Sequence, residues 1–152
     1  YGKFWVVRRF AYRNVEFDEP MDGIVYAASA ALGLASLENV LYVFAAYVTS
    51  PSLAIGTIIV RAIFSVPGHA LFSGVWGYAL GRARFMAAEQ RKGIVLRGLV
   101  LGMVLHGIFN LLLFSADVVA YAMVVFILVL TPGLWILTDR NIRSALRWQR
   151  QR

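Results

Sequence analysis

The sequence IVLRGLVLGMVLHGIFNLLLF, residues 94–114, decides the fold, because it is apolar except at Arg97, His106 and Asn110. Runs of about 18 or more largely apolar residues are typical of membrane-crossing helices, since about 20 residues span a hydrocarbon core about 30 Å thick. Three further runs share this length and character, at residues 24–48, 53–80 and 118–138. The sequence therefore predicts an all-α, polytopic membrane helix bundle with four transmembrane helices and amphipathic ends on the cytoplasmic side.

Composition also points to a membrane. Hydrophobic residues make up 60% of the 152-residue chain and charged residues 15%, whereas a soluble domain has about 25% charged residues. The absence of cysteine excludes disulfide and thiolate chemistry. We expect residues 1–152 to form one membrane-embedded domain. Because the chain opens with Tyr1 rather than Met, we expect it to be a fragment of a longer protein.

The basic residues predict the orientation of the chain. The net charge is +7, and all but one of the 15 Lys and Arg residues fall before the first span, around the link between the second and third spans, or in the tail. The connections at residues 49–52 and 115–117 contain no Lys or Arg. The positive-inside rule then places both termini and the loop at residues 81–92 in the cytoplasm. Basic ends attract anionic lipid headgroups, so we expect a bilayer, and no nucleic acid, as the partner of this charge.

Small residues and prolines mark where the spans should pack or bend. On the third span, two glycines precede His106 and Asn110 at intervals of four residues, which places all four on one ridge of the helix. Pro67 interrupts the second span just before His69, and a proline removes a backbone donor and usually kinks a helix.

Three ionisable residues lie deep in three different spans. An ionisable side chain in the hydrocarbon region costs about 2.5 kcal/mol or more, so such residues seldom persist without a function. Counted from the predicted cytoplasmic boundaries, Glu38 lies about 21 Å, His69 about 16 Å and His106 about 18 Å along the helix axes. This common depth predicts that the three side chains meet in one polar site inside the membrane.

Two imidazoles and one carboxylate match a catalytic zinc site, with His69, His106 and Glu38 as ligands and one position open for water. Zinc would lower the pKa of that water to about 7. Asn110, one turn beyond His106, could donate a hydrogen bond to a developing oxyanion. Arg61 is rotated by about 80° from His69 around the helix. We therefore expect Arg61 to balance Glu38 or to hold a substrate carbonyl, and not to pair with His69.

Each of these residues also has a purely structural interpretation. A membrane histidine can simply hydrogen-bond to a neighbouring helix, Glu38 and Arg61 can form a buried ion pair, and Asn39 and Asn110 can hold helices together. These interpretations account for the residues singly. They do not account for the common depth of Glu38, the two histidines and Asn110.

At these positions the sequence resembles the PrsW family of intramembrane proteases, which are related to the CAAX-processing prenyl proteases. The segment LASLENVLY, residues 34–42, is similar to the second motif of the family, which is centred on a glutamate. Arg61 and His69, with seven residues between them, match the third motif, and His106 and Asn110 match the fourth, HxxxN. The likeness extends from EFDEPMDG, residues 16–23, to Asn110.

The resemblance implies an endopeptidase that cleaves membrane-anchored proteins, such as anti-sigma factors, in a prokaryotic cell membrane. It implies active-site roles for both histidines and Asn110, with Glu38 ligating zinc or assisting a glutamate-activated water. The first motif of the family is a glutamate pair followed two residues later by lysine. Lys3 stands at the lysine position, so the two acids would precede Tyr1. The resemblance implies that one of them is the catalytic base, so we expect activity from the full protein and not from residues 1–152 alone. Leu34 replaces a frequent Phe.

Two other functions fit parts of the sequence. Helices interrupted near Pro67 and Pro132, together with polar residues near the midplane, also suit a component of an ion or proton transporter. A transporter of this kind would be expected to show inverted-repeat symmetry, and the sequence has no evident internal repeat. A non-catalytic membrane scaffold derived from a protease is the other alternative.

Overall fold

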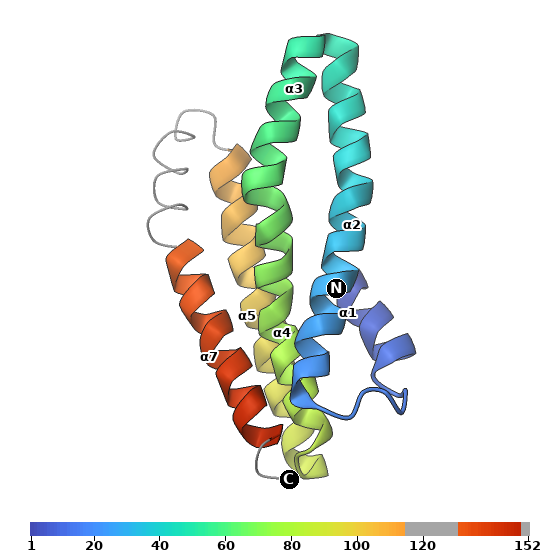
Figure 1. Ribbon diagram of the computed structural model, residues 1–152, viewed down its shortest axis with the longest axis vertical. Helices are drawn as coiled ribbons and strands as arrows, with labels where there is room; N and C mark the ends of the chain where they lie inside the picture. The colour runs from blue at the N-terminus through green and yellow to red at the C-terminus, as the bar shows by residue number, and fades with distance from the viewer. Residues whose placement is uncertain (115–130, 150–152) are drawn as a thin grey trace.

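The computed structural model describes residues 1–114 and 131–149, and all the elements in this part of the chain are helical (Figure 1). The all-α prediction is therefore confirmed for the described residues. The elements are α1 (Gly2–Val6), the π-helical segment η1 (Val7–Ala11), α2 (Pro20–Thr49), α3 (Pro51–Val60), the π-helical segment η2 (Arg61–Ser65), α4 (Val66–Arg84), α5 (Ala88–Phe114) and α7 (Thr131–Gln149).

Three described helices are long and apolar enough to cross a membrane: Pro20–Thr49, the continuous helix Pro51–Arg84, and Ala88–Leu111. They contain or largely cover the spans predicted at residues 24–48, 53–80 and 94–114. Residues 118–130 of the predicted fourth span lie outside the described residues. Its last part belongs to α7, which does not end at residue 138 but continues to Gln149, so a count of four spans is not confirmed.

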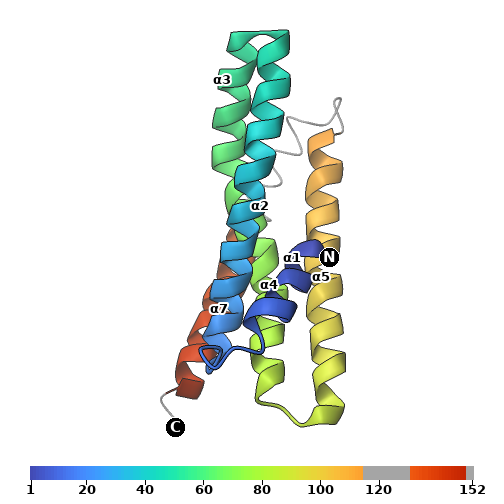
Figure 2. The same ribbon diagram turned by 90° about the vertical axis from the view of Figure 1, so that its right-hand side faces the viewer.

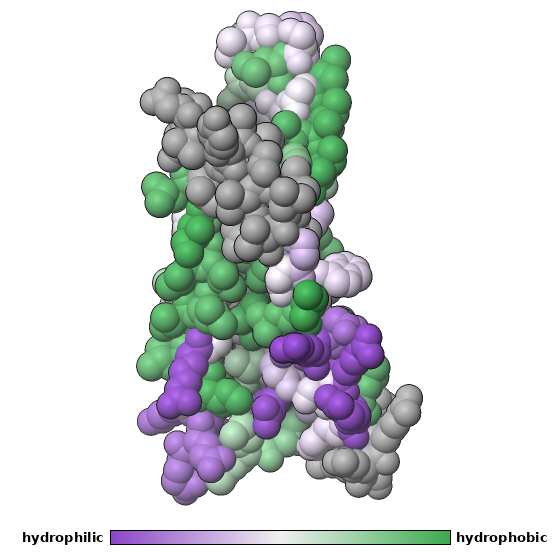
Figure 3. Space-filling view, turned by 90° about the vertical axis from the view of Figure 1, so that its left-hand side faces the viewer, coloured by the Kyte–Doolittle hydropathy of each residue, from purple (hydrophilic) through white to green (hydrophobic). Residues whose placement is uncertain are grey.

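The outer surface of the bundle is that of a multi-pass membrane protein. Large apolar side chains face outward along the spans, as Val40 and Phe44 illustrate with 66% and 67% exposure. Figure 3 shows a hydrophobic band on the face that it presents and hydrophilic residues gathered at the lower end. Such a surface is stable when lipid replaces water around it.

The first long helix begins where its sequence directs. Pro20 occupies the first turn of α2, where its missing N–H costs nothing. The carboxylate of Asp22 accepts a hydrogen bond from the backbone N–H of Glu19 at 2.7 Å and one from that of Asp18 at 3.0 Å. These contacts satisfy donors just outside the helix and place a negative charge near its N-terminus.

Helix α4 is the centre of the bundle, with α2, α5 and α7 packed around it (Figures 1 and 2). Glycines bring the backbones together, as the sequence predicted. A Cβ at Gly77 of α4 would overlap Gly23 and Ala27 of α2. A Cβ at Gly102 of α5 would lie only 2.9 Å from the carbonyl oxygen of Phe72. Close backbone approach of this kind is how membrane helices gain packing energy.

The segment before Pro67 is wound as a π-helix, η2, and α4 then continues from Val66. A proline cannot donate to the preceding turn and crowds the carbonyl four residues earlier. The wider π-helical turn accommodates this within one continuous membrane helix, and π-helical turns are frequent at functional sites.

Helix α1 folds back against the bundle. Phe4 and Val7 are buried in a cluster with Ala27, Trp76 and Leu80, and Figure 2 shows α1 between α2 and α5 in the lower half of the bundle. This packing carries the first residues of the chain from its basic end toward the middle of the helices. At the other end of the chain, the predicted amphipathic tail is part of α7, which packs against α4 and buries Leu134 and Ala145.

Candidate active site

One cavity of about 500 Å³ lies between α2, the continuous helix α3–η2–α4, and α5. All five residues that the sequence predicted for the site line this cavity: Glu38, Arg61, His69, His106 and Asn110. The prediction that polar groups from three spans meet in one place is therefore confirmed. Their catalytic or ligating roles are not tested by this geometry.

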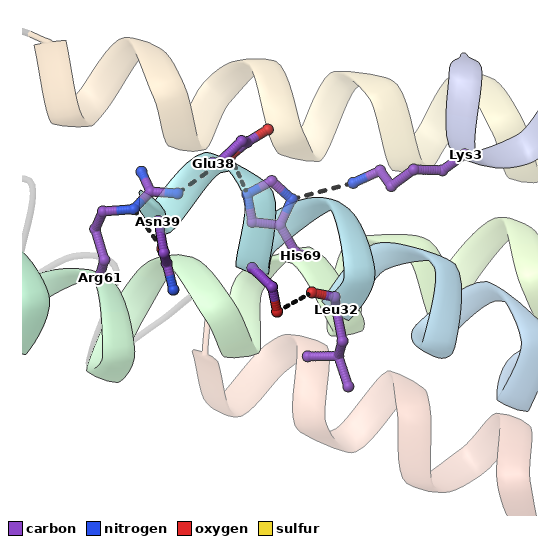
Figure 4. Close-up of polar contacts among 7 residues, drawn as sticks. Lys3, Leu32, Glu38, Asn39, Arg61 and His69 are labelled. Atoms are coloured by element: carbon purple, nitrogen blue, oxygen red, sulfur yellow. Dashed lines mark hydrogen bonds and ion pairs between the residues drawn. The ribbon is translucent and has the colours of Figure 1, made fainter. Parts of the chain in front are cut away.

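Glu38 of α2 is the centre of the polar contacts (Figure 4). Its Oε2 lies 3.1 Å from Nε2 of His69 and 3.2 Å from Nη2 of Arg61. Both contacts use the same carboxylate oxygen, Oε2. No other described residue forms a hydrogen bond or ion pair with Oε1. The Glu38 side chain is 31% exposed and lines the cavity.

Arg61 is held by three residues of α2. Its Nε donates to Oδ1 of Asn39 at 2.6 Å, its Nη2 donates to Glu38, and its guanidinium lies 4.2 Å from the ring centre of Tyr42. The side chain is only 12% exposed. A planar guanidinium suits this combination of two hydrogen bonds and a cation–π contact. As predicted, Arg61 balances Glu38, and among the described residues no hydrogen bond joins it to His69.

Lys3 reaches His69 from α1, on the side opposite Arg61 (Figure 4). Its Nζ lies 3.1 Å from Nδ1 of His69. Burial lowers the pKa of the Lys3 ammonium, and the Glu38 carboxylate opposes this change. A protonated Lys3 can only donate, so Nδ1 of His69 accepts and Nε2–H donates to Glu38. His69 thus bridges a cation and a carboxylate.

His106 of α5 completes one wall of the cavity. Its ring lies edge-on to that of His69, with 5.0 Å between ring centres and 82° between planes. Phe72 of α4 stacks on its other side at 5.5 Å and 19°. Asn110 lies one turn further along α5, exposed at the edge of the cavity. The stacked phenylalanine restricts rotation of the imidazole.

The described residues do not fit a three-ligand zinc centre as they are arranged. No group of three His, Cys, Asp or Glu residues within residues 1–111 and 132–148 is placed to hold a metal ion. Lys3 and Glu38 occupy the two ring nitrogens of His69, whereas a ligating imidazole gives one nitrogen to the metal. Zinc ligation by His69, His106 and Glu38 therefore stays a prediction.

Three contributors to the site were not assigned by sequence reasoning. The sequence pattern does not distinguish Tyr42 and Phe72 from the other aromatic residues of the spans. Lys3 was noted only at the lysine position of the family's first motif. That motif was the one signal that could have placed Lys3 in the site, whereas nothing in the sequence marks the two rings.

Comparison with known proteins shows the family of the chain. Residues 1–134 match the model of a family described as PrsW family intramembrane metalloprotease. The chain belongs to the PrsW family. Its PrsW relatives include proteins named Protease PrsW from Geobacillus kaustophilus, 38% identical over 97% of this chain, and from Bacillus subtilis, 36% identical over 84% of it. The alignments cover 60% and 56% of those PrsW proteins, so the chain spans somewhat over half their length. No solved structure matches it.

Proposed function

We propose that the protein is an intramembrane endopeptidase that hydrolyses peptide bonds of membrane-anchored protein substrates. The observation that carries the proposal is the carboxylate of Glu38, held by His69 and Arg61 in a cavity between membrane helices. Membership of an intramembrane protease family supports the same activity.

The reaction that fits this arrangement is attack by a water bound next to Oε1 of Glu38. Glu38 takes a proton from the water as general base, and the oxygen forms a bond to the carbonyl carbon of the substrate. The proton then passes to the nitrogen of the peptide bond, which breaks to give a carboxylic acid and an amine. His69 and Arg61 hold the carboxylate in one orientation throughout.

The negative charge that develops on the substrate carbonyl oxygen needs donors in the same cavity. His106 and Asn110 lie on one face of α5 and line the wall that a substrate would face. Arg61 uses Nε and Nη2 for its contacts within the described residues, which leaves Nη1 for a carbonyl oxygen. Donors fixed before the reaction stabilise such an oxyanion by about 3–4 kcal/mol each.

The family description names a metalloprotease, and a metal would supply the same activation of water. The arrangement of His69 favours a route through Glu38 alone. Cleavage that survives exhaustive chelation would support that route. Cleavage that is lost on chelation and restored by zinc would reject it in favour of ligation by His69, His106 and Glu38.

We further propose that the protein lies in a bacterial cell membrane with both termini in the cytoplasm and acts on anchored regulators such as anti-sigma factors. The arginines near the N-terminus, around the α4–α5 turn and along α7 lie at one end of the bundle (Figure 1), as the positive-inside rule requires. The bacterial PrsW relatives support the location.

The test is cleavage of a membrane-anchored reporter by the full-length protein in proteoliposomes. Glu38→Gln, His69→Ala and His106→Ala should abolish cleavage while the thermal unfolding transition in detergent is retained. Asp139→Asn is the matched control, because its ion pair with Arg143 is on the exposed face of α7. Wild-type turnover by the three site variants would reject the proposal, and ion flux without proteolysis would favour a transporter.

A further inference from the structure

A second groove lies away from the candidate active site, where α1 and η1 cross the beginning of α5. It has a volume of about 450 Å³. At one end it is lined by Arg8, Arg91 and Lys92. It is continuous with a neighbouring cavity of about 660 Å³, which shares Arg8 and Arg91 and adds Arg9 and Arg13. No acidic residue lines either cavity among the described residues.

The cations at this end, Arg8, Arg91 and Lys92, form no ion pair within the described part of the chain. Arg91 donates from Nε to the carbonyl oxygen of Met86 at 2.8 Å, which fixes its stem and leaves its two terminal nitrogens for another acceptor. Arg84 is different, because its guanidinium is used by the carbonyl oxygens of Tyr12 and Asn14.

The other end of the groove is apolar. Val95, Leu96 and Leu99 follow Lys92 along α5 and line the same cavity. Leu99 lies about 10 Å further along the helix axis than Lys92, toward the middle of the membrane span. Leu96 is 61% exposed. The groove therefore changes from cationic to apolar in the direction from the end of the bundle to its centre.

We infer that this groove is a binding site for an anionic phospholipid of the leaflet at the basic end of the bundle. The phosphate of the headgroup lies against Arg8, Arg91 and Lys92, and an acyl chain runs along Val95, Leu96 and Leu99. Basic pockets between membrane helices are suited to such headgroups. A free anion or an acidic peptide would use the cationic end and leave the apolar end empty, so the shape of the groove favours a lipid.

The site is independent of the proposed proteolysis, although α1 connects the two regions. The same short segment carries Lys3 to His69 and places Arg8 in the groove. A bound lipid therefore braces the segment that delivers Lys3, and it stabilises the folded protein because it binds the folded state alone.

The test is native mass spectrometry of the full-length protein released from detergent with equimolar dioleoyl phosphatidylglycerol and dioleoyl phosphatidylcholine. Wild-type protein should retain phosphatidylglycerol in preference. The triple variant Arg8→Gln, Arg91→Gln, Lys92→Gln should lose at least about tenfold in affinity for it, since each basic residue near an anionic headgroup contributes roughly a fivefold change.

The matched control is Arg140→Gln, Arg143→Gln, Arg147→Gln on α7, which removes the same charge elsewhere and should keep affinity within about twofold. Equal losses in both triple variants would overturn the proposal, since binding would then reflect net charge alone. The neutral change Leu96→Asn, at an exposed position, should also weaken phosphatidylglycerol binding, and it decides the matter if the triple variant misfolds. Displacement of the lipid by inorganic phosphate or oligoglutamate, with no effect of Leu96→Asn, would identify a simple anion site and overturn the lipid assignment.

Discussion

Nζ of Lys3 lies 3.1 Å from Nδ1 of His69, although 66 positions separate the two residues in the chain. The contact exists because Phe4 of α1 and Val7 at the start of η1 are buried against Trp76 and Leu80 of α4. It places a cation on one side of His69 while Glu38 lies on the other. With Lys3 protonated, the imidazole is held in one tautomer and one orientation, which suits the proposed role of Glu38 as general base.

Lys3 makes stability depend on pH in a predictable direction. Burial lowers its pKa in the folded protein below the ordinary value of 10.5. Between the lowered pKa and 10.5 the unfolded chain binds more protons than the folded one, so the contribution of Lys3 to stability rises with pH. The cost of burying the ammonium is fully present below the folded pKa and is gone above 10.5.

The measurement compares the unfolding of wild type and Lys3→Met in detergent as pH is raised. The stability of wild type relative to the variant should increase toward alkaline pH. Lys92→Met is the control, because it removes the same charge from an exposed position outside the candidate active site. A relative stability that falls as pH rises would mean that attraction to Glu38 outweighs desolvation at Lys3.

The ion pair of Arg61 and Glu38 should be more sensitive to geometry than to charge. Arg61→Lys keeps the charge but loses the planar fork that serves Glu38 and Asn39 together. We expect cleavage to fall markedly and stability to fall by about 1–3 kcal/mol, the usual cost of an unsatisfied buried polar group. Arg143→Lys, in the exposed pair with Asp139, should change neither quantity. Full activity of Arg61→Lys would contradict a role for the Arg61 guanidinium in cleavage.

The close approach of α2 and α4 can be tested by adding a single methyl group. A Cβ at Gly77 would overlap Gly23 and Ala27, so Gly77→Ala should destabilise the protein by about 1–3 kcal/mol. At Gly33, on α2, nothing lies within 4 Å of an added Cβ. Gly33→Ala should therefore be neutral or stabilising by up to about 1 kcal/mol, the helix propensity difference. Equal thermal unfolding of the two variants would contradict this packing.

Spacing along single helices predicted the centre of the site. The common depth of Glu38, His69 and His106 followed from counting residues, and the structure places the Glu38 and His69 side chains 3.1 Å apart and the two imidazole rings 5.0 Å apart. The rotation of Arg61 away from His69 followed from the helical period. These relations are local, because the number of residues from a membrane boundary fixes the height of a side chain.

The remaining contacts depend on how helices pack, which periodicity does not encode. Asn39 and Tyr42 contact Arg61 only because α2 packs beside the following helix at a height that brings these three residues level. Lys3 enters the site only because α1 folds back onto α4. The extent of α7 is a similar case, since the apolar run that defines the predicted span ends at residue 138 while the helix continues to Gln149 and packs on α4.

The cavity offers a position at which preference for the substrate residue can be tested without disturbing the fold. Gly56 of α3 lines the cavity, and nothing lies within 4 Å of a Cβ built on it. Gly56→Leu would therefore place a side chain in the space that a substrate residue would occupy, with no cost to helix packing. If the cavity binds the residue next to the cleaved bond, large side chains should be excluded first.

We expect Gly56→Leu to retain wild-type thermal stability, to cleave a reporter with Ala or Gly at the scissile bond, and to lose at least about tenfold in kcat/KM for one with Phe or Leu there. Gly107→Leu is the matched control, because its Cβ also meets open space but the residue does not line the cavity. Equal rates of Gly56→Leu and wild type on both reporters would show that the substrate does not enter between α3 and α5, even if the catalytic role of Glu38 holds.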